Sequence, residues 1–97
     1  MTLKDKIING EKLDKLEVMD LVYEDADLDY ELVEEIMHDH GRWMMHMETI
    51  IKIDDKYYSI IWDRGLTEYQ ENEFYGQIAK PVVKKEIISY KWVREEL

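Results

Sequence analysis

The segment WMMHMETIIKIDDKYYSIIWD, residues 43–63, decides the fold because it has the pattern of two strands joined by a tight turn. Apolar and polar residues alternate on both sides of Asp54-Asp55, as in a β-hairpin with a two-residue loop. Such a loop fixes the register and leaves one face of the hairpin almost wholly apolar. On that face the predicted pairs are Ile51 with Tyr58, Thr49 with Ile60 and Met47 with Trp62. On the other face they are Lys52 with Tyr57, Glu48 with Ile61 and His46 with Asp63.

After the hairpin, the chain predicts a short helix and a third strand. Thr67 and Gln70 have the spacing of a capping box, which predicts a helix near residues 68–75. The run from about Val82 to Val93 is rich in Val and Ile and predicts the third strand. Pro81 fits a strand entry, where its missing N–H costs little.

Before the hairpin, the first residues predict helices. Thr2 is placed to cap a short helix that ends at Asn9-Gly10. Residues 11–23 fit two structures, of which we favour a helix. The helical stripe comprises Leu13, Leu16, Met19 and Tyr23, and the alternating strand pattern comprises Leu16, Val18 and Val22.

Residues 28–40 predict an amphipathic helix with an acidic outer face. At about 100° per residue, the apolar residues share one broad side of this helix. They are Leu28, Leu32, Val33, Ile36 and Met37, and the opposite side holds Glu31, Glu34, Glu35 and His38. Asp27 or Asp29 is placed to cap its start, and Gly41 is placed to end it.

Together these elements predict a single α+β domain over residues 1–97, with two or three helices packed on an antiparallel three-stranded β-meander. Residues 1–41 form its helical, acidic part, and residues 42–97 form the meander with the short helix near residues 68–75. The absence of Cys excludes disulfides and thiolate chemistry. The charged first residues do not predict a signal peptide, and no run approaches the roughly 18 apolar residues of a membrane span.

The net charge of −10 arises in one block of the chain. Residues 16–41 hold ten acids and no Lys or Arg, whereas the rest of the chain is nearly balanced. A field of one sign repels nucleic acids and anionic membranes and attracts basic surfaces. The same block is also typical of a solvated helix face.

Catalytic chemistry is disfavoured by the residues present. Ser59 and Ser89 both lie in strand-like runs, and no Gly-x-Ser-x-Gly, phosphate-binding Gly-rich loop or His-Glu-x-x-His occurs. Acids are abundant, but without an apolar pocket nothing indicates a shifted pKa. We therefore expect a protein that is not an enzyme.

A metal site is disfavoured by the placement of the histidines. Such a site needs three or four convergent ligands, and on a helix His38 and His40 diverge by about 160°. We expect no metal and no cofactor. His38 is then a solvated side chain, His40 lies near a helix end, and His46 pairs with Asp63 across the hairpin.

The run RWMMHMETIIKIDDKYYSIIWDRGLTEYQENEF, followed by KPVVKKEIISYKW, resembles small uncharacterised proteins of phages and prophages of low-GC Gram-positive bacteria. In these, an Arg-Trp pair opens a strand, a Tyr-rich strand follows, and a Gly-Leu-Thr-Glu-x-Gln turn leads to a Val-rich last strand. The resemblance covers about the last 55 residues, leaves out the acidic block, and implies no agreed activity. Phage genes of this kind include anti-CRISPR proteins, several of which are small, acidic and imitate DNA, and this analogy bears on function without fixing a site.

The acidic block and this resemblance predict a phage-derived inhibitor of a host nucleic-acid-handling defence protein. The specific hypothesis is an anti-CRISPR protein that binds a CRISPR effector nuclease in the cytoplasm of the host bacterial cell, without direct nucleic-acid or membrane contact. An acidic surface occupies a groove meant for phosphates and needs no catalytic group. The expected partner-binding residues are Asp25, Asp27, Asp29, Glu31, Glu34 and Glu35. A second acidic patch comprises Glu68, Glu71 and Glu73.

The alternative hypothesis is an acidic regulatory binding module, antitoxin- or adaptor-like, that docks through an aromatic sheet face. Its candidate residues are Trp43, Tyr57, Tyr58, Trp62 and Trp92. The two hypotheses differ in their salt dependence, because aromatic docking is screened far less than a charge-driven complex. A homodimer through an exposed sheet edge is a further option.

Overall fold

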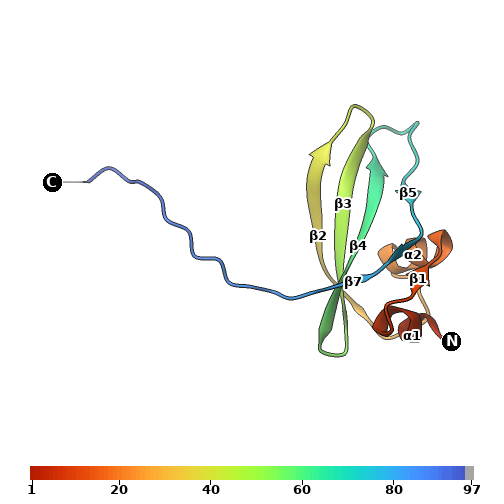
Figure 1. The fold of residues 1–97 in the computed structure, drawn as a ribbon. Helices are drawn as coiled ribbons and strands as arrows, with labels where there is room; N and C mark the ends of the chain where they lie inside the picture. Colours follow the sequence, from red (N-terminus) through yellow and green to blue (C-terminus); the bar gives the residue numbers. More distant parts are fainter. Residues whose placement is uncertain (96–97) are drawn as a thin grey trace.

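The computed structural model describes residues 1–95, apart from the side chain of His40. Within this range the chain forms two short helices and seven strands (Figure 1). The helices are α1 (Leu3–Ile8) and α2 (Lys15–Val22). The strands are β1 (Lys12–Leu13), β2 (Glu31–His40), β3 (Met44–Ile53), β4 (Lys56–Gly65), β5 (Glu73–Phe74), β6 (Gln77–Ile78) and β7 (Lys80–Val82).

The predicted hairpin is confirmed as β3 and β4, with the predicted register. The two strands pair antiparallel over their whole length, from Met44 opposite Gly65 to Ile53 opposite Lys56. Asp54 adopts φ 56° in the turn, a left-handed conformation that Asp tolerates better than most side chains. Each of the six predicted cross-strand pairs is present.

The predicted helix over residues 28–40 is wrong: residues 31–40 form strand β2, which pairs antiparallel with β3. The helical pattern arises from a β-bulge. Leu32 lies opposite Ile51 and Met37 opposite Met47, so both lie on the inner face of the sheet although they are an odd number of residues apart. The shift between Leu32 and Glu34 adds one residue and reverses the alternation, which hides the strand in the sequence.

The predicted third strand from Val82 to Val93 is also wrong. The segments that pair with the far side of β4 are β5 and β7, which together with β2, β3 and β4 make a five-stranded antiparallel sheet. Val82 pairs with Tyr57, and β4 begins one residue earlier at Lys56. The ladder therefore ends there, and residues 83–95 form no regular element despite their Val and Ile content.

The predicted helix near residues 68–75 does not form. Residues 66–72 make bends and turns, in which the Thr67 carbonyl accepts from Gln70 N at 3.0 Å. The chain then returns beside β4 at once, because Phe74 pairs with Trp62 and its ring stacks on the indole at a centroid distance of 5.4 Å. A loop this short leaves no room for two helical turns before that contact.

Gln77 fills the gap that β5 and β7 leave along β4. Its side-chain Oε1 accepts from Ile61 N at 2.9 Å, and its Nε2 donates to Ile61 O at 2.7 Å. The amide side chain thus replaces a strand residue. Meanwhile the backbone of β6 turns away and pairs with β1 in a small two-stranded sheet.

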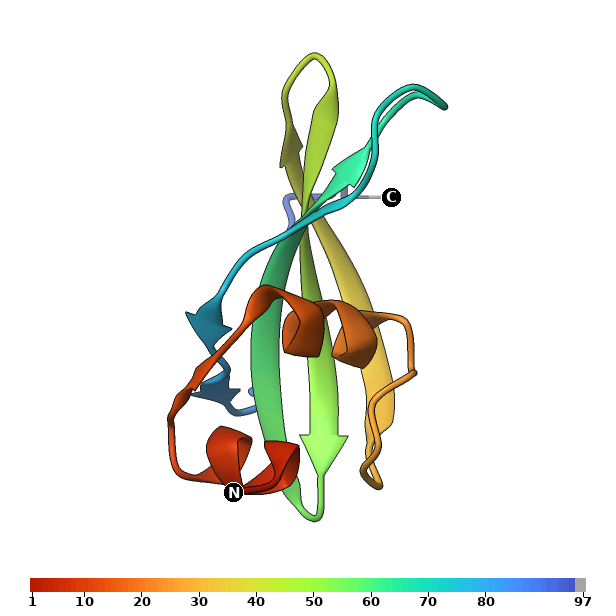
Figure 2. The same cartoon turned by 90° about the vertical axis from the view of Figure 1, so that its right-hand side faces the viewer.

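The helix at residues 3–8 is confirmed, and the ambiguous segment 11–23 contains both β1 and the favoured helix, α2. Each helix begins with a capping box, formed by Thr2 with Asp5 and by Asp14 with Glu17. Figure 2 shows that both helices cross the same face of the sheet. The opposite face of the sheet, here called the outer face, carries no helix.

The core lies between the helices and the inner face of the sheet. One side is made by residues of α1, β1 and α2, which are Ile7, Leu13, Val18, Leu21 and Val22. The other side is made by residues of the sheet, with Ala79 from between β6 and β7; the sheet residues are Met47, Ile51, Ile53, Tyr58, Ile60, Trp62 and Phe74. Trp62 Nε1 donates to Thr49 Oγ1 at 2.9 Å inside this core. The buried side-chain polar atoms of the described residues all have partners.

The fold class is therefore different from the predicted helices on a three-stranded meander. The protein is mostly sheet, with five strands in one sheet, two in another, and two short helices. Residues 1–41 are not a helical part, because they contribute the edge strand β2. Among residues 1–95, no helix is long and apolar enough to cross a membrane.

Residues 83–95, here called the C-terminal arm, leave the body after β7 and run away from it (Figure 1). The radius of gyration of 16.9 Å is larger than the roughly 13 Å of a compact domain of this length. The arm's large apolar side chains are exposed, with Ile87 at 86%, Tyr90 at 91% and Trp92 at 103% of their reference areas.

Gly65 is the position at which a side chain is excluded most clearly. A methyl group there would lie 2.1 Å from the backbone O of Gln70. We predict that Gly65→Ala lowers the free energy of unfolding by about 2 kcal/mol, because the β4–β5 loop must shift. Gly41→Ala is the matched control, since its methyl would lie 3.9 Å from Met44 O, and it changes stability by about 0.5 kcal/mol or less. Equal urea midpoints for the two variants would contradict this packing.

Candidate functional site

The acids predicted to bind a partner lie at one end of the sheet and along its edge. We define the acidic strip as the exposed acids of the α2–β2 connection and of β2, which are Glu24, Asp25, Asp27, Asp29, Glu31, Glu34, Glu35 and Asp39. All six predicted residues belong to it. The first part of the strip runs through bends rather than a helix, and the second part follows β2.

The connection that carries the first acids is anchored to α2. Tyr30 Oη donates to the carbonyl oxygens of Leu21 at 2.9 Å and Asp20 at 3.3 Å. Burial raises the pKa of Tyr30, which keeps this hydroxyl protonated and able to donate. Asp25 N donates to the Asp20 carbonyl at 2.8 Å. These bonds hold the acidic connection against the end of the helix.

Along β2 the acids project on both sides of the sheet edge. Glu34 lies opposite Ile50 on the outer face, whereas Glu35 lies opposite Thr49 on the inner face. Both are exposed because β2 is the terminal strand of the sheet. The negative charge therefore surrounds the edge rather than one helix face.

Little positive charge opposes the strip. The ion pairs found among the described side chains join Lys4 to Asp54, Lys6 to Glu17, His38 to Glu48 and His46 to Asp63. None of these involves an acid of the strip. Lys52 lies opposite Glu31 at one end, and its ammonium group is 5.8 Å from the centre of the Tyr57 ring.

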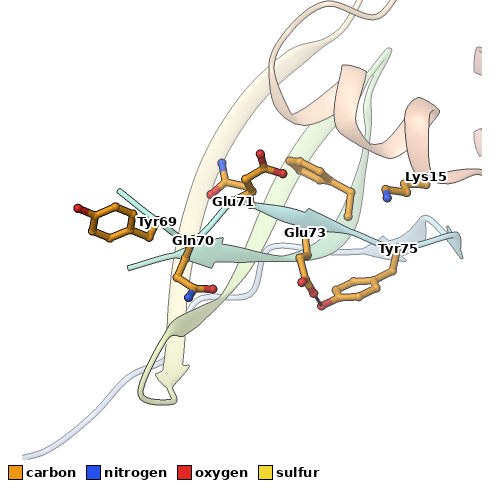
Figure 3. Close-up of a pocket in the computed structure, with 8 residues that line it drawn as sticks. Lys15, Tyr69, Gln70, Glu71, Glu73 and Tyr75 are labelled. Atoms are coloured by element: carbon orange, nitrogen blue, oxygen red, sulfur yellow. Dashed lines mark hydrogen bonds between the residues drawn. The ribbon is translucent and has the colours of Figure 1, made fainter. Parts of the chain in front are cut away.

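The second predicted patch lies in the β4–β5 loop and in β5, not on a helix. Glu68, Glu71 and Glu73 are exposed. The Tyr75 hydroxyl donates to Glu73 at 3.0 Å (Figure 3). Lys15 and Tyr69 lie at opposite ends of the open hollow lined by this segment. Its acids therefore have neighbouring polar and basic groups, unlike those of the acidic strip.

The aromatic residues of the alternative hypothesis do not share a face. Tyr58 and Trp62 are buried in the core, with 4% and 5% exposure. Tyr57 faces the outer side, Trp92 belongs to the C-terminal arm, and Trp43 lies between β2 and β3. The structure thus provides no continuous aromatic surface of these five residues.

The predicted pair of His46 and Asp63 is present, with 2.7 Å between Nδ1 and Oδ1. Asp63 also accepts from the Tyr75 hydroxyl at 2.5 Å. Burial raises the pKa of Asp63, but the hydrogen bonds from Tyr75 and His46 outweigh this effect and the net pKa is lowered. The hydrogen bond to Asp63 raises the pKa of Tyr75 far above its ordinary value.

A second network joins three strands on the outer face. His38 Nε2 lies 2.9 Å from Glu48 Oε1, so His38 is not merely the solvated side chain that was expected. The Ser59 hydroxyl donates to the other oxygen of Glu48. Hydrogen bonds from Ser59 and then from His38 lower the pKa of Glu48. The network ties β2 and β4 to the central strand β3.

Neither network has the arrangement of a Ser-His-acid triad. In a nucleophilic triad the imidazole contacts the hydroxyl, whereas here the carboxylate of Glu48 separates Ser59 from His38. The Ser59 hydroxyl therefore contacts a carboxylate rather than an imidazole. Among the described residues, no three His, Asp or Glu side chains converge as a metal would require. The expectation about His38 and His40 on a helix does not apply, because both lie in β2.

Sequence reasoning missed most of these contacts. The pairing of Glu48 with Ser59 runs diagonally across the hairpin, and the predicted register contained the signal for it. The contacts of Tyr75 with Asp63 and of Asn72 with Tyr23, at 2.8 Å, depend on the path of the β4–β5 loop. No local pattern in the sequence predicts that path.

Comparison with protein-family models, with curated proteins and with solved structures finds no match.

The lowered pKa values of Glu48 and Asp63 predict a loss of stability in acid. Each group has a lower pKa in the folded chain than its ordinary values of 4.5 and 3.8, so the unfolded state takes up protons first as the pH falls. Their stabilisation is complete above these ordinary values and is lost as the pH falls through the lowered ones. We expect Glu48→Gln and Asp63→Asn each to cost about 1 kcal/mol at pH 7 and to reduce the further loss at pH 3. Urea unfolding at both pH values measures this, with the exposed Glu11→Gln as control. A loss at pH 3 as large as in the unsubstituted chain would contradict the assignment.

Proposed function

We propose that this chain is a non-enzymatic inhibitor, which uses the acidic strip to occupy a phosphate-binding surface of a host nucleic-acid-handling protein. The resemblance to phage proteins narrows the proposal to an anti-CRISPR protein that binds a CRISPR effector nuclease in the bacterial cytoplasm. The observation that carries the proposal is the strip itself: four exposed acids in the α2–β2 connection and four along β2, with Lys52 opposite Glu31 at one end and Lys84 in the groove beside Glu34.

The dimensions of the strip support an imitation of DNA. The ten residues of β2 span roughly 33 Å, close to the roughly 34 Å of one turn of duplex DNA. The ladder with β3 and the anchor at Tyr30 hold the carboxylates on a rigid support, so little ordering entropy is lost on binding. Fixed negative charge of this kind also accelerates association with a basic groove.

The binding mode explains why no catalytic group is needed. An inhibitor that competes with nucleic acid for a basic groove acts by occupancy alone. Its affinity then depends on charge pairs whose formation releases counterions, so binding weakens as salt increases. The two hydrogen-bonded networks around Glu48 and Asp63 have a structural role in this proposal, because they join the strands of the sheet.

The proposal predicts that neutralising the strip weakens partner binding. The triple variant Glu31→Gln, Glu34→Gln and Glu35→Gln should raise the Kd for a purified effector–guide complex at least about tenfold and flatten its salt dependence. The fold should be retained, because all three side chains are exposed. Titration calorimetry at two or more salt concentrations, with circular dichroism of each variant, measures both effects.

The matched control removes the same charge from elsewhere on the surface. Glu11→Gln, Asp55→Asn and Glu95→Gln change exposed acids outside the strip and outside the second acidic patch, and this variant should bind nearly as tightly as the unsubstituted chain. Equal losses in the two triple variants would show a general effect of net charge. An unchanged affinity of the strip variant would overturn the proposed binding surface.

A further inference from the structure

The C-terminal arm has the composition of a strand but no strand to pair with. The ladder of β7 ends at Val82, where β4 begins. In an extended chain Ile88, Tyr90 and Trp92 share one side, and all three are largely exposed. A row of exposed large apolar side chains at this spacing is typical of a binding segment rather than a solvated tail.

The edge of β2 offers the backbone partner that the arm lacks. Among residues 1–95, β2 is the terminal strand of the five-stranded sheet, so its outer backbone groups face no neighbouring strand. Beside this edge on the outer face lies an apolar groove with a volume of about 260 Å³. It lies between β2 and the start of the arm, and its lining includes Val33, Ile36, Ile50, Tyr57 and Val83.

The charges of the arm and of this edge are complementary. The arm carries Lys84, Lys85, Lys91 and Arg94 against the two acids Glu86 and Glu95. The groove and the adjoining edge carry Glu34, Glu35 and Glu48, of which Glu48 is paired with His38, and the chain's own Lys84 lines the same groove. An arm that lies along β2 would therefore cover the apolar groove and neutralise part of the acidic edge at the same time.

A second copy of the chain fits these observations better than the arm's own body. The arm points away from the sheet from which it starts (Figure 1). Its thirteen residues reach roughly 40 Å when extended, enough to follow the whole of a neighbouring β2. To reach its own β2 as a strand, the arm would have to reverse immediately after Val83, where the chain has neither Gly nor Pro to form a turn.

We propose that two copies of this chain form a dimer by exchanging arms. Each arm adds to the free edge of β2 in the other copy as a sixth strand, and places Ile88, Tyr90 and Trp92 over the apolar groove. The two contacts are identical and related by a two-fold axis, so the assembly closes as a dimer. Main-chain hydrogen bonds supply pairing and the groove supplies specificity. The inference does not rest on the proposed inhibitor function, because its test uses the purified chain alone; an arm on β2 would compete with a partner for Glu34 and Glu35.

Sedimentation equilibrium of the full chain tests the exchange. The unsubstituted chain should give twice the chain mass. The arm variant Tyr90→Ser with Trp92→Ser, and the edge variant Val33→Lys with Glu34→Lys, should each raise the dimer Kd at least about tenfold. The control is Tyr69→Ser, because Tyr69 is an equally exposed aromatic residue outside the arm, at 86% exposure, and it should leave the dimer unchanged. Circular dichroism checks that each variant is folded.

Mixing the two variants distinguishes arm exchange from other dimers. The arm variant keeps an intact edge and the edge variant keeps an intact arm, so a mixture of equal parts restores one of the two contacts. We therefore expect a mixed dimer, captured through a tag on one variant, that is tighter than either variant alone. A monomeric unsubstituted chain, a dimer indifferent to both variants, or a mixture without mixed dimers would each overturn the proposal.

Discussion

The turn at Asp54-Asp55 is the constraint on which the rest of the structure depends. Because it uses only two residues, it sets the register of every pair between β3 and β4. That register brings Thr49 within 2.9 Å of the Trp62 indole nitrogen and puts Ile51 and Ile60 on the face that the helices cover. A slip of one residue would turn those side chains to the outer face and bury Glu48 and Lys52 instead. The strands on both sides of the hairpin take their positions from this pairing.

The sequence predicts the elements that depend on neighbouring residues. It does not predict the elements that depend on pairing between residues far apart in the chain. The hairpin and the Thr2 cap each follow from a few neighbouring residues, and both are confirmed. The strand at residues 31–40 has the pattern of a helix in the sequence, because the bulge near Val33 gives its apolar residues helical spacing. The strands β5, β6 and β7 are two or three residues long, too short to show any periodicity. The path of the loop from Leu66 to Asn72 is determined by the contact of Phe74 with Trp62. No pattern in the neighbouring residues predicts that contact.

The exposure of the acids in the strip can be predicted from the sequence, but the directions in which they project cannot. Charged side chains are almost always exposed, so charge alone predicts that the acids from Asp25 to Glu35 lie on the surface. Composition does not predict the direction in which each side chain projects from the backbone. On a helix, Glu31, Glu34 and Glu35 would share one face, whereas on β2 they project on both sides of an edge that also offers free backbone groups. The change from helix to strand turns a charged face into a strand-pairing site with charged flanks.

The side chain of Gln77 has a consequence for how the sheet opens. Residues 73–82 lie beside β4 as two short ladders, with one amide group bridging the backbone between them. These contacts with β4 can break one at a time, because the loss of β7 need not break the contact of β5, and the bridging amide of Gln77 can be released alone. In amide hydrogen exchange, the Ile61 N–H would then follow the mobility of a single side chain, while its neighbours along β4 follow whole strands. This edge of the sheet consists of short segments that can separate independently, rather than of one continuous strand.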